Sequence, residues 1–315
     1  MRSTSQAQPD RQPDAGRGYT SPMLLIVNPA AAGGRVGRHW TRLRSRLSTV
    51  GFSPPEAFTE APGHATEIAA AAVRSGEDVV VAAGGDGTIC EVVQGLHDAK
   101  GGALGVLPLG TGNDAARTLG LPLELERAAR VILEGGRRRV DLMRAGDHVV
   151  LNAIGIGLLG AININAADIK LVRGIAAYLA AAVGTLFTYR SPEIGVSDGV
   201  FRYKGGMTIL AIHNGPTTGG GFRLAPAAVP DDGALDACLV GPVGIAGRLV
   251  RLGAALKGTL GKTAGAHELR FHRLELTTEV TLPCHLDGNP FHFEPPGMTF
   301  EVVPAALAVI APRIA

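Results

Sequence analysis

Hydrophobic residues in the first half of the chain follow two alternating patterns. Residues 24–27 form a fully apolar run, which is typical of a buried parallel strand, and apolar side chains at helical spacing predict an amphipathic helix over 37–50. The same succession of a strand and a helix occurs again along the chain. We expect further strands at 78–83 and 103–107 and helices at 65–75, 91–96 and 115–119. Successive units of strand, loop and helix predict a parallel sheet covered by helices on both faces.

Past residue 136 the pattern changes. Short apolar segments have the spacing of antiparallel strands, at 140–143, 149–153, 207–213, 235–240, 273–276 and 300–303, and helical patterns occur at 175–187 and 245–256. We therefore predict a three-layer α/β domain at 22–136 and a β-rich domain, built as an antiparallel sandwich, at 137–303. Residues 1–21 are rich in polar residues and proline and are expected to be a disordered tail.

The composition fits a folded protein and narrows its partners. Of the 315 residues 46% are hydrophobic, and 30 Lys and Arg nearly balance 28 Asp and Glu, which argues against a surface built for nucleic acid. The three cysteines form no Cys-x-x-Cys motif, so we expect no zinc knuckle and a reducing, cytoplasmic location. The longest uncharged stretch, 174–189, is shorter than the ~20 residues that span a bilayer as a helix, so we expect no transmembrane segment.

Three glycine-rich segments follow the three predicted parallel strands, at 30–34, 84–88 (GGDGT) and 110–114 (GTGND). Ligands of open parallel sheets bind beyond the carboxyl ends of the strands, and glycine lets backbone N–H groups approach an anion closely. We therefore expect a phosphate site, although neither the P-loop motif nor the GxGxxG dinucleotide fingerprint is present. Asp86 and Asp114 lie within these segments, and a carboxylate beside a phosphate implies a divalent metal.

The order of these motifs resembles the diacylglycerol kinase catalytic domain family, which includes sphingosine kinases and bacterial lipid kinases. The resemblance begins with IVNP at 26–29, GGDGT followed by Glu91, and GTGND. It continues through Asp141, 174–178, 219–226, DDGALD at 231–236 and HLDG at 285–288, and so covers the chain from about Met23 to its end. It implies an α/β domain like those of NAD kinases and phosphofructokinases, completed by a C-terminal strand at about 304–315.

The resemblance further implies transfer of the γ-phosphate of ATP to a lipid hydroxyl, with Mg²⁺ as the metal and the nucleotide in the cleft between the domains. Nucleotide contacts are implied at Asn28, Pro29, Gly33, Gly34, Thr59, Gly84, Gly85, Asp86, Gly87, Thr88, Glu91, Gly110, Thr111 and Asn113. Asp86, Asp114 and Asp141 would form an acidic network around magnesium, and Asp287 would be the general base. Asp232, with backbone carbonyls near Val229 and Ala234, would hold a separate structural magnesium.

Asn289 departs from the family, which usually has Glu two residues after the Asp of this motif. Asn cannot accept a proton, so the chain would be slow or inactive if that Glu is the family's base. Two alternatives to a lipid kinase therefore stay open: a nucleotide-binding regulatory pseudokinase, and a kinase of a soluble substrate such as NAD. Among lipid alcohols, diacylglycerol and sphingosine-like bases are equally compatible with the sequence.

A basic face on the first predicted helix suggests where such an enzyme would work. Arg35, Arg38, Arg42 and Arg46 recur three or four residues apart, either as a solvated face or as a surface that docks on anionic lipid headgroups at ~1 kcal/mol per residue. We expect peripheral binding at the inner membrane face, and a homodimer is a further hypothesis about partners.

Overall fold

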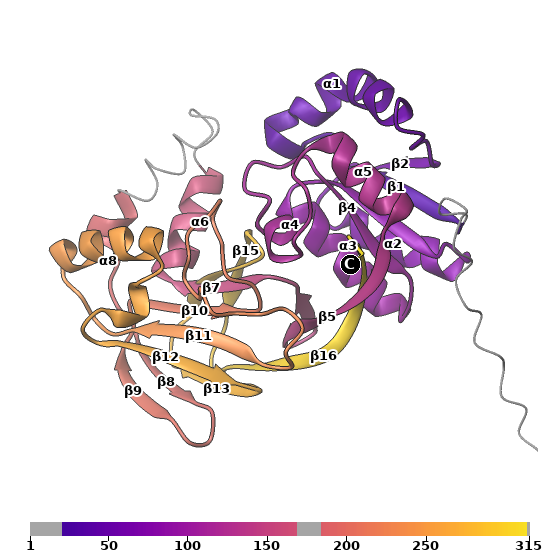
Figure 1. The fold of residues 1–315 in the computed structure, drawn as a ribbon. Coiled ribbons are helices and arrows are strands. Elements are labelled where there is room, and N and C mark those ends of the chain that lie inside the picture. The colour runs from indigo at the N-terminus through magenta and orange to yellow at the C-terminus, as the bar shows by residue number, and fades with distance from the viewer. Residues whose placement is uncertain (1–20, 169–183, 314–315) are drawn as a thin grey trace, which may run out of the picture.

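The computed structural model describes residues 21–168 and 184–313, which form two domains joined by a long strand (Figure 1). The predicted tail at 1–21 lies outside these residues except for Ser21. Of the predicted helix at 175–187, residues 175–183 lie outside them and residues 184–187 are helical. Within the described chain the strands form two sheets, of ten and six strands. No helix in 21–168 or 184–313 combines the length and the apolar character needed to cross a membrane.

The first domain is a parallel sheet between two helical layers. Its strands lie in the order β2 (Glu56–Phe58), β1 (Met23–Val27), β3 (Val79–Gly84) and β4 (Ala103–Pro108). Alternate residues of β1 face opposite sides, because Leu25 and Val27 pack with helices α1 (Ala31–Ser48) and α5 (Leu125–Glu134), whereas Ile26 packs with α2 (His64–Arg74) and α3 (Asp86–Ala99). The predicted three-layer α/β architecture is confirmed.

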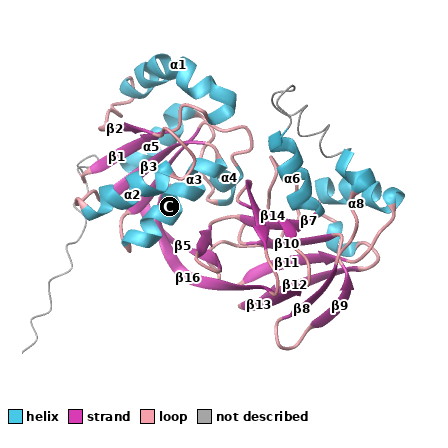
Figure 2. Ribbon diagram, turned by 180° about the vertical axis from the view of Figure 1, so that it is seen from behind, coloured by secondary structure: helices cyan, strands magenta, loops and turns pink. Residues whose placement is uncertain are grey.

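The second domain is an antiparallel sandwich, as predicted (Figure 2). One sheet has the order β12 (Ala266–Phe271), β11 (Leu235–Val240), β10 (Ile209–His213), β7 (Ala153–Gly157), β14 (Leu282–Leu286) and β15 (Asn289–Phe293), with every pair antiparallel. The facing strands are β8 (Glu193–Ser197), β9 (Arg202–Gly206), β13 (Arg273–Thr278) and the first half of β16 (Gly297–Ala311). Apolar side chains of both sheets, such as Ile156 and Leu274, share one buried core. Helices α6 (Leu158–Asp168) and α8 (Ile245–Lys257) contribute to a second apolar cluster with the six-stranded sheet.

Strand β16 belongs to both domains. Phe300 pairs with Ala145 at the end of β5 (Gly136–Ala145) in the sandwich, while Ala308 pairs in parallel with Ala103 of β4. The register shifts between Val303 and Leu307, where the strand passes from one domain to the other. The same backbone therefore fixes the first sheet against the second domain.

Some predicted elements have different limits. The expected strand at 149–153 divides into β6 (His148–Val150) and β7, because the N–H groups of Leu151 and Asn152 donate to a side chain rather than to a neighbouring strand. The GGDGT segment is not wholly a loop, since Gly84 ends β3 and Asp86 begins α3. The sequence pattern does not predict the short or partly exposed elements β2, α5, β8, β9, β12 and β15, and it also misses α6 and the mostly buried strand β14.

Candidate functional site

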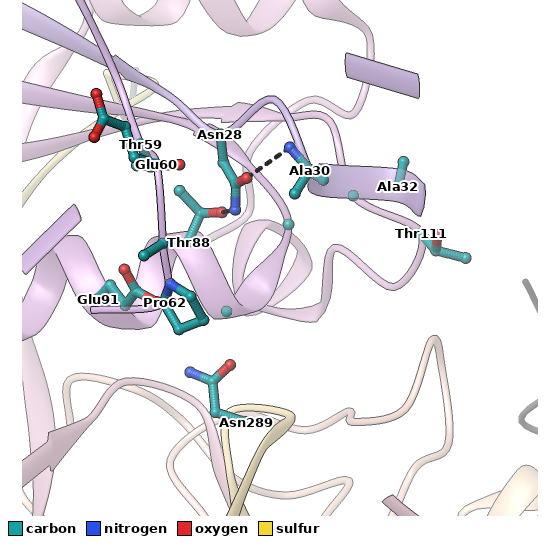
Figure 3. A pocket seen from close by; sticks show the side chains of 15 residues that line it. Asn28, Ala30, Ala32, Thr59, Glu60, Pro62, Thr88, Glu91, Thr111 and Asn289 are labelled. Carbon is teal, nitrogen blue, oxygen red and sulfur yellow. Dashed lines mark hydrogen bonds between the residues drawn. The ribbon is translucent and has the colours of Figure 1, made fainter. Parts of the chain in front are cut away.

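A cavity of about 390 Å³ lies at the carboxyl ends of the parallel strands (Figure 3). Its walls come from the segments after β1 and β2, the start of α3, the segment after β4 and one residue of the second domain. The lining residues are Asn28, Ala30, Ala31, Ala32, Thr59, Glu60, Ala61, Pro62, Gly85, Gly87, Thr88, Glu91, Gly110, Thr111 and Asn289. The predicted meeting of three glycine-rich segments at one edge of the sheet is therefore present.

Two hydrogen bonds of the Asn28 side chain fix one wall of the cavity. The Asn28 side-chain amide donates to Thr88 Oγ1 at 2.9 Å, and its Oδ1 accepts the backbone N–H of Ala30 at 2.9 Å (Figure 3). Beyond Ala30 the backbone is left-handed at Ala32, Gly33 and Gly34, with φ of 52°, 66° and 79°, before α1 becomes regular. Two of these three residues are glycine, which adopts this region without strain. Asn28 thereby couples the first strand to the start of α3.

Glycines let the segments after β3 and β4 approach each other closely. A Cβ at Gly84 would lie 2.3 Å from Thr88 Oγ1, and a Cβ at Gly110 would lie 2.5 Å from the Cα of Gly85. Asn113 holds the second segment, because its Oδ1 accepts the N–H of Gly110 at 2.9 Å. The glycines are needed for close packing at the cavity floor as well as for exposing backbone N–H groups.

Two carboxylates converge beside this floor. A Cβ at Gly112 would lie 2.9 Å from Asp86 Oδ2 and 3.3 Å from Asp114 Oδ2, so both oxygens border a space that only glycine leaves open. Asp86 Oδ1 accepts the N–H of Ala115 at 2.9 Å, and Asp114 Oδ2 accepts the N–H of Gly220 from the second domain at 2.6 Å. Burial raises the pKa of Asp86, and the charge of Asp114 raises it further.

This pair suits Mg²⁺, which proteins commonly bind through one or two carboxylates while phosphates and water supply the other ligands. Across 21–168 and 184–313, no group of three or more His, Cys, Asp and Glu side chains is arranged to hold a metal. The residues present therefore fit a magnesium ion that arrives with a nucleotide, rather than one caged by protein alone.

Asp287 is buried and held by backbone N–H groups. Its Oδ1 accepts from Asn152 at 3.0 Å and Ala153 at 2.7 Å, and its Oδ2 accepts from Leu151 at 2.9 Å. Burial raises its pKa to about 7, the three N–H groups oppose that rise, and the charge of Asp86 adds to it. A carboxyl group with this pKa exchanges its proton near neutral pH, which a general acid or base requires.

Two histidines near Asp287 are weak bases. Burial lowers the pKa of both His213 and His285 to about 4, so both are neutral at pH 7. His285 Nδ1 accepts the N–H of Gly288 at 3.3 Å, which braces the turn that carries Asp287. This contact gives His285 a structural role in the turn, while Asp287 in the same turn has a pKa close to neutral.

Asn289 crosses from the second domain to the GGDGT segment. A Cβ at Gly87 would lie 2.6 Å from Asn289 Oδ1, and Figure 3 shows the Asn289 side chain facing the start of α3 from across the cavity. Asn289 also lies close to the buried Cys90 thiol, whose pKa is raised well above its usual value chiefly by burial. A residue singled out only as a departure from a motif thus lines the cavity.

Other predicted residues lie outside the cavity wall. Asp141 is buried, its carboxylate accepts the N–H groups of Gly233 and Ala305 at 2.7 Å each, and Ala305 belongs to the β16 crossover. The structure therefore places Asp141 at the junction of the domains, where it organises backbone. Pro29, Gly33, Gly34, Gly84 and Asn113 likewise shape the segments without lining the cavity, and Asp86, Asp114 and Asp287 are also outside its lining.

In the loop predicted to hold a structural magnesium, the carboxylate of Asp232 is already paired with an arginine. Asp232 Oδ2 lies 2.8 Å from the Arg270 guanidinium, and Asp232 Oδ1 accepts the N–H of Ala234 at 3.1 Å. Val229 is 43% exposed. These residues fit a dedicated metal site poorly, because Arg270 would have to leave Asp232 first. The metal role of this loop stays a prediction.

Sequence reasoning missed the loop after β2 and the cradle of Asp287. Glu60, Ala61 and Pro62 line the cavity beside Thr59, but the three-residue strand before them has no clear periodic signal. Residues 149–153 (VVLNA) are mostly apolar, as in a buried strand, and a strand that ends in a buried turn matches that pattern equally well.

Comparisons with known proteins agree over both domains. Residues 22–145 match the model of the diacylglycerol kinase catalytic domain, and residues 152–311 match that of the YegS C-terminal NAD kinase beta sandwich-like domain. A probable lipid kinase YegS-like protein of Pseudomonas syringae pv. syringae (strain B728a) is 35% identical over 253 residues, covering 79% of this chain and 81% of the relative. One from Chromohalobacter salexigens is 34% identical over 260 residues, covering 80% and 81%.

A solved structure shares the same architecture. A crystal structure from Bacillus anthracis str. Sterne, described as that of a candidate diacylglycerol kinase, superposes with a TM-score of 0.74 at 25% identity, over 92% of this chain and 97% of that one. The sequence matches span both halves, and the structural match includes the sandwich as well as the parallel sheet. The chain therefore belongs to the diacylglycerol kinase catalytic domain family of phosphotransferases, and the relatives named above are probable YegS-like lipid kinases.

Proposed function

We propose that this chain is an ATP-dependent kinase that phosphorylates the hydroxyl group of a membrane lipid, diacylglycerol or a related lipid alcohol. The observation that carries the proposal is the meeting of the Asp86 and Asp114 carboxylates at Gly112, beside a cavity walled by three glycine-rich segments. Glycine segments suit polyphosphate, and the carboxylates suit the metal that accompanies it.

The nucleotide would lie in the cavity with its phosphates towards the start of α3. Asn28 and Thr88, which already hydrogen-bond each other, would orient the phosphate chain, and backbone N–H groups of the glycine segments would neutralise its charge. Mg²⁺ held by Asp86 and Asp114 would stabilise the charge that develops on the transferred phosphoryl group.

Asp287 would accept the proton of the attacking hydroxyl. The lipid oxygen forms a bond to the γ-phosphorus, the bond from that phosphorus to the ADP oxygen breaks, and the hydroxyl proton passes to the carboxylate. Since three backbone N–H groups already bind this carboxylate, one contact would loosen as the hydroxyl approaches. Only the ionised form can act, so a pKa of about 7 predicts that turnover increases with pH through this value.

The regulatory pseudokinase is the second candidate, because Asn289 lines the cavity where a carboxylate would be expected in the family. Transfer of labelled phosphate from ATP to diacylglycerol in mixed micelles tests the two functions together. Binding of ATP with no transfer to any lipid of a panel would favour the pseudokinase. Transfer to NAD in place of lipid would favour a kinase of a soluble substrate.

We propose that the enzyme meets its substrate as a peripheral protein at the inner face of the membrane. On α1, however, the basic face is partly engaged: Arg46 is bound to Glu126 at 2.5 Å and 2.8 Å, and Arg38 donates to the carbonyl of Gly33. Arg42 and Arg35 remain exposed on the same helix. This face alone is a weak membrane anchor, because surface charges contribute little when paired within the protein.

A further inference from the structure

Helix α8 presents apolar side chains to solvent and arginines to the protein. Leu249 is 50% exposed, Val250 is 65% exposed and Leu256 is 56% exposed, whereas Arg248 in the same helix is only 9% exposed. A surface helix of a globular protein normally places its apolar stripe against the core and polar residues in solvent. Leu252 and Ala255 of α8 follow this rule, so the exposed apolar side chains are additional to the stripe that packs on the core.

Hydrogen bonds from Arg248 fix the orientation of α8. The guanidinium of Arg248 donates to the carbonyls of Leu186 at 2.6 Å, Tyr189 at 2.8 Å and Val243 at 3.1 Å. These bonds tie α8 to residues 186–189, where Phe187 is 56% exposed. Rotation of the helix about its axis would break the bonds from Arg248 to Leu186 and Tyr189. We define the α8 apolar face as the exposed side chains of Phe187, Ile245, Leu249, Val250 and Leu256.

The stretch of chain that carries α8 is basic in sequence, and the nearest acidic side chain after it is Glu268, whose carboxylate lies beside Gly261. Residues 237–267 contain no Asp or Glu, while Arg248, Arg251, Lys257 and Lys262 lie among them. Lys257 ends α8 and Lys262 follows it, and both are exposed. The face therefore combines exposed apolar side chains with lysines at its edge. This combination complements a bilayer, which has an apolar interior and can have negatively charged headgroups.

We propose that the α8 apolar face docks this protein on a bilayer that contains anionic phospholipid, with the apolar side chains in the interface and Lys257 and Lys262 at the headgroups. The proposal rests on the proposed function only in that a lipid kinase must reach a substrate held in a membrane. A second copy of this chain is the other occupant that could cover these apolar side chains, and the test below separates it from a bilayer. Figure 1 shows α8 beside α6 on the outer side of the six-stranded sheet, away from the first domain.

Vesicle co-sedimentation of the full-length chain, without ATP, tests the proposal. Vesicles of phosphatidylglycerol mixed with phosphatidylcholine are compared with vesicles of phosphatidylcholine alone. We expect the wild type to prefer the anionic vesicles, and the double variant L249S/V250S to bind them at least about tenfold more weakly, because two apolar side chains no longer enter the interface. We expect K257Q/K262Q to lose most of the preference for anionic vesicles.

A matched control separates this face from general surface hydrophobicity. Val200 is 95% exposed and Val280 is 50% exposed, both away from α8, so V200S/V280S removes similar apolar surface and should bind vesicles like the wild type. Circular dichroism checks that every variant is folded.

Three results would overturn the proposal: no vesicle binding by the wild type, wild-type binding by L249S/V250S, or a change from dimer to monomer in L249S/V250S with vesicle binding intact. The proposed function fails by a different result, because a protein that binds vesicles and transfers no phosphate keeps the docking face and loses the kinase activity.

Discussion

The two domains contribute to the site in different ways. The first contributes contiguous glycine-rich segments at the ends of parallel strands, so that most of the cavity wall comes from residues 28–111. The second contributes single side chains, Asp287 and Asn289, which are remote in sequence and reach the site only through the sandwich. The difference teaches that an anion cradle is built by local backbone geometry, whereas the properties of a proton acceptor depend on burial and tertiary hydrogen bonds.

The largest effect is expected in the first domain. Asp86→Ala removes one of the two carboxylates at Gly112, so turnover should fall by about 10³-fold, within the range for loss of a group that stabilises transition-state charge. The free energy of unfolding should change little, because Asp86 lies at the start of α3 and contributes no apolar contact to the core. Steady-state phosphate transfer and thermal melting measure the two effects.

Asp98→Ala is the matched control for this variant. Asp98 lies on the same helix and bonds only Gln94 among the described residues. Its turnover should match that of the wild type. Normal turnover by Asp86→Ala, with unchanged dependence on magnesium, would contradict the role given to the carboxylate pair.

A smaller but more diagnostic effect is expected in the second domain. Asp287→Asn should lower the catalytic rate by about 10²-fold while nucleotide binding persists, in line with the contribution of a general base. Because the base acts when ionised, wild-type activity should fall as the pH drops below about 7, and the residual activity of the variant should lack this dependence.

The backbone cradle of Asp287 offers another explanation for a loss of activity. An Asn side chain keeps one acceptor oxygen for the N–H groups of residues 151–153, so melting of the variant reports on the cradle separately. A parallel loss of folding stability and activity, with the pH profile unchanged, would mean that Asp287 organises backbone and does not accept a proton.

Gly112→Ala tests the part that backbone geometry plays in the first domain's site. The new Cβ would displace the carboxylate oxygens of Asp86 and Asp114, so the KM for magnesium–ATP should rise by about tenfold. Loss of a group that orients a metal ligand has an effect of this size. Gly184→Ala is the control, since a Cβ there meets open space. Equal KM values for the two variants would mean that the carboxylates do not meet the metal at this position.

The smallest effect concerns the loop at Asp232. If Arg270 is the partner of Asp232, as their 2.8 Å contact indicates, Arg270→Gln should lower the melting temperature slightly and EDTA should leave the wild type unchanged. A clear drop in melting temperature on chelation, restored by magnesium, would instead support the predicted metal site at Val229, Asp232 and Ala234.

The parallel strands and their loops could be predicted because their signals are local. An apolar run followed by glycine predicts a strand end in any context, and so Asn28, Gly85 and Gly110 could be placed at one sheet edge from sequence. The Asp287 cradle could not be predicted in this way. Its donors lie about 135 residues away, and the turn at residues 151–152 lies within the mostly apolar stretch 149–153, which predicts one strand. The role of Asn289 at Gly87 likewise depends on a contact between domains.

The central claim is that this site transfers phosphate to a lipid with Asp287 as base, although Asn289 stands in the cavity wall. Transfer of labelled phosphate from ATP to diacylglycerol in mixed micelles tests it most directly, with wild type, Asp287→Asn and Asn289→Glu assayed together. We predict that the wild type transfers phosphate, that Asp287→Asn nearly stops doing so, and that Asn289→Glu is as active as the wild type or more so. A wild type that binds ATP and phosphorylates no lipid until Asn289 is replaced by Glu would contradict the claim.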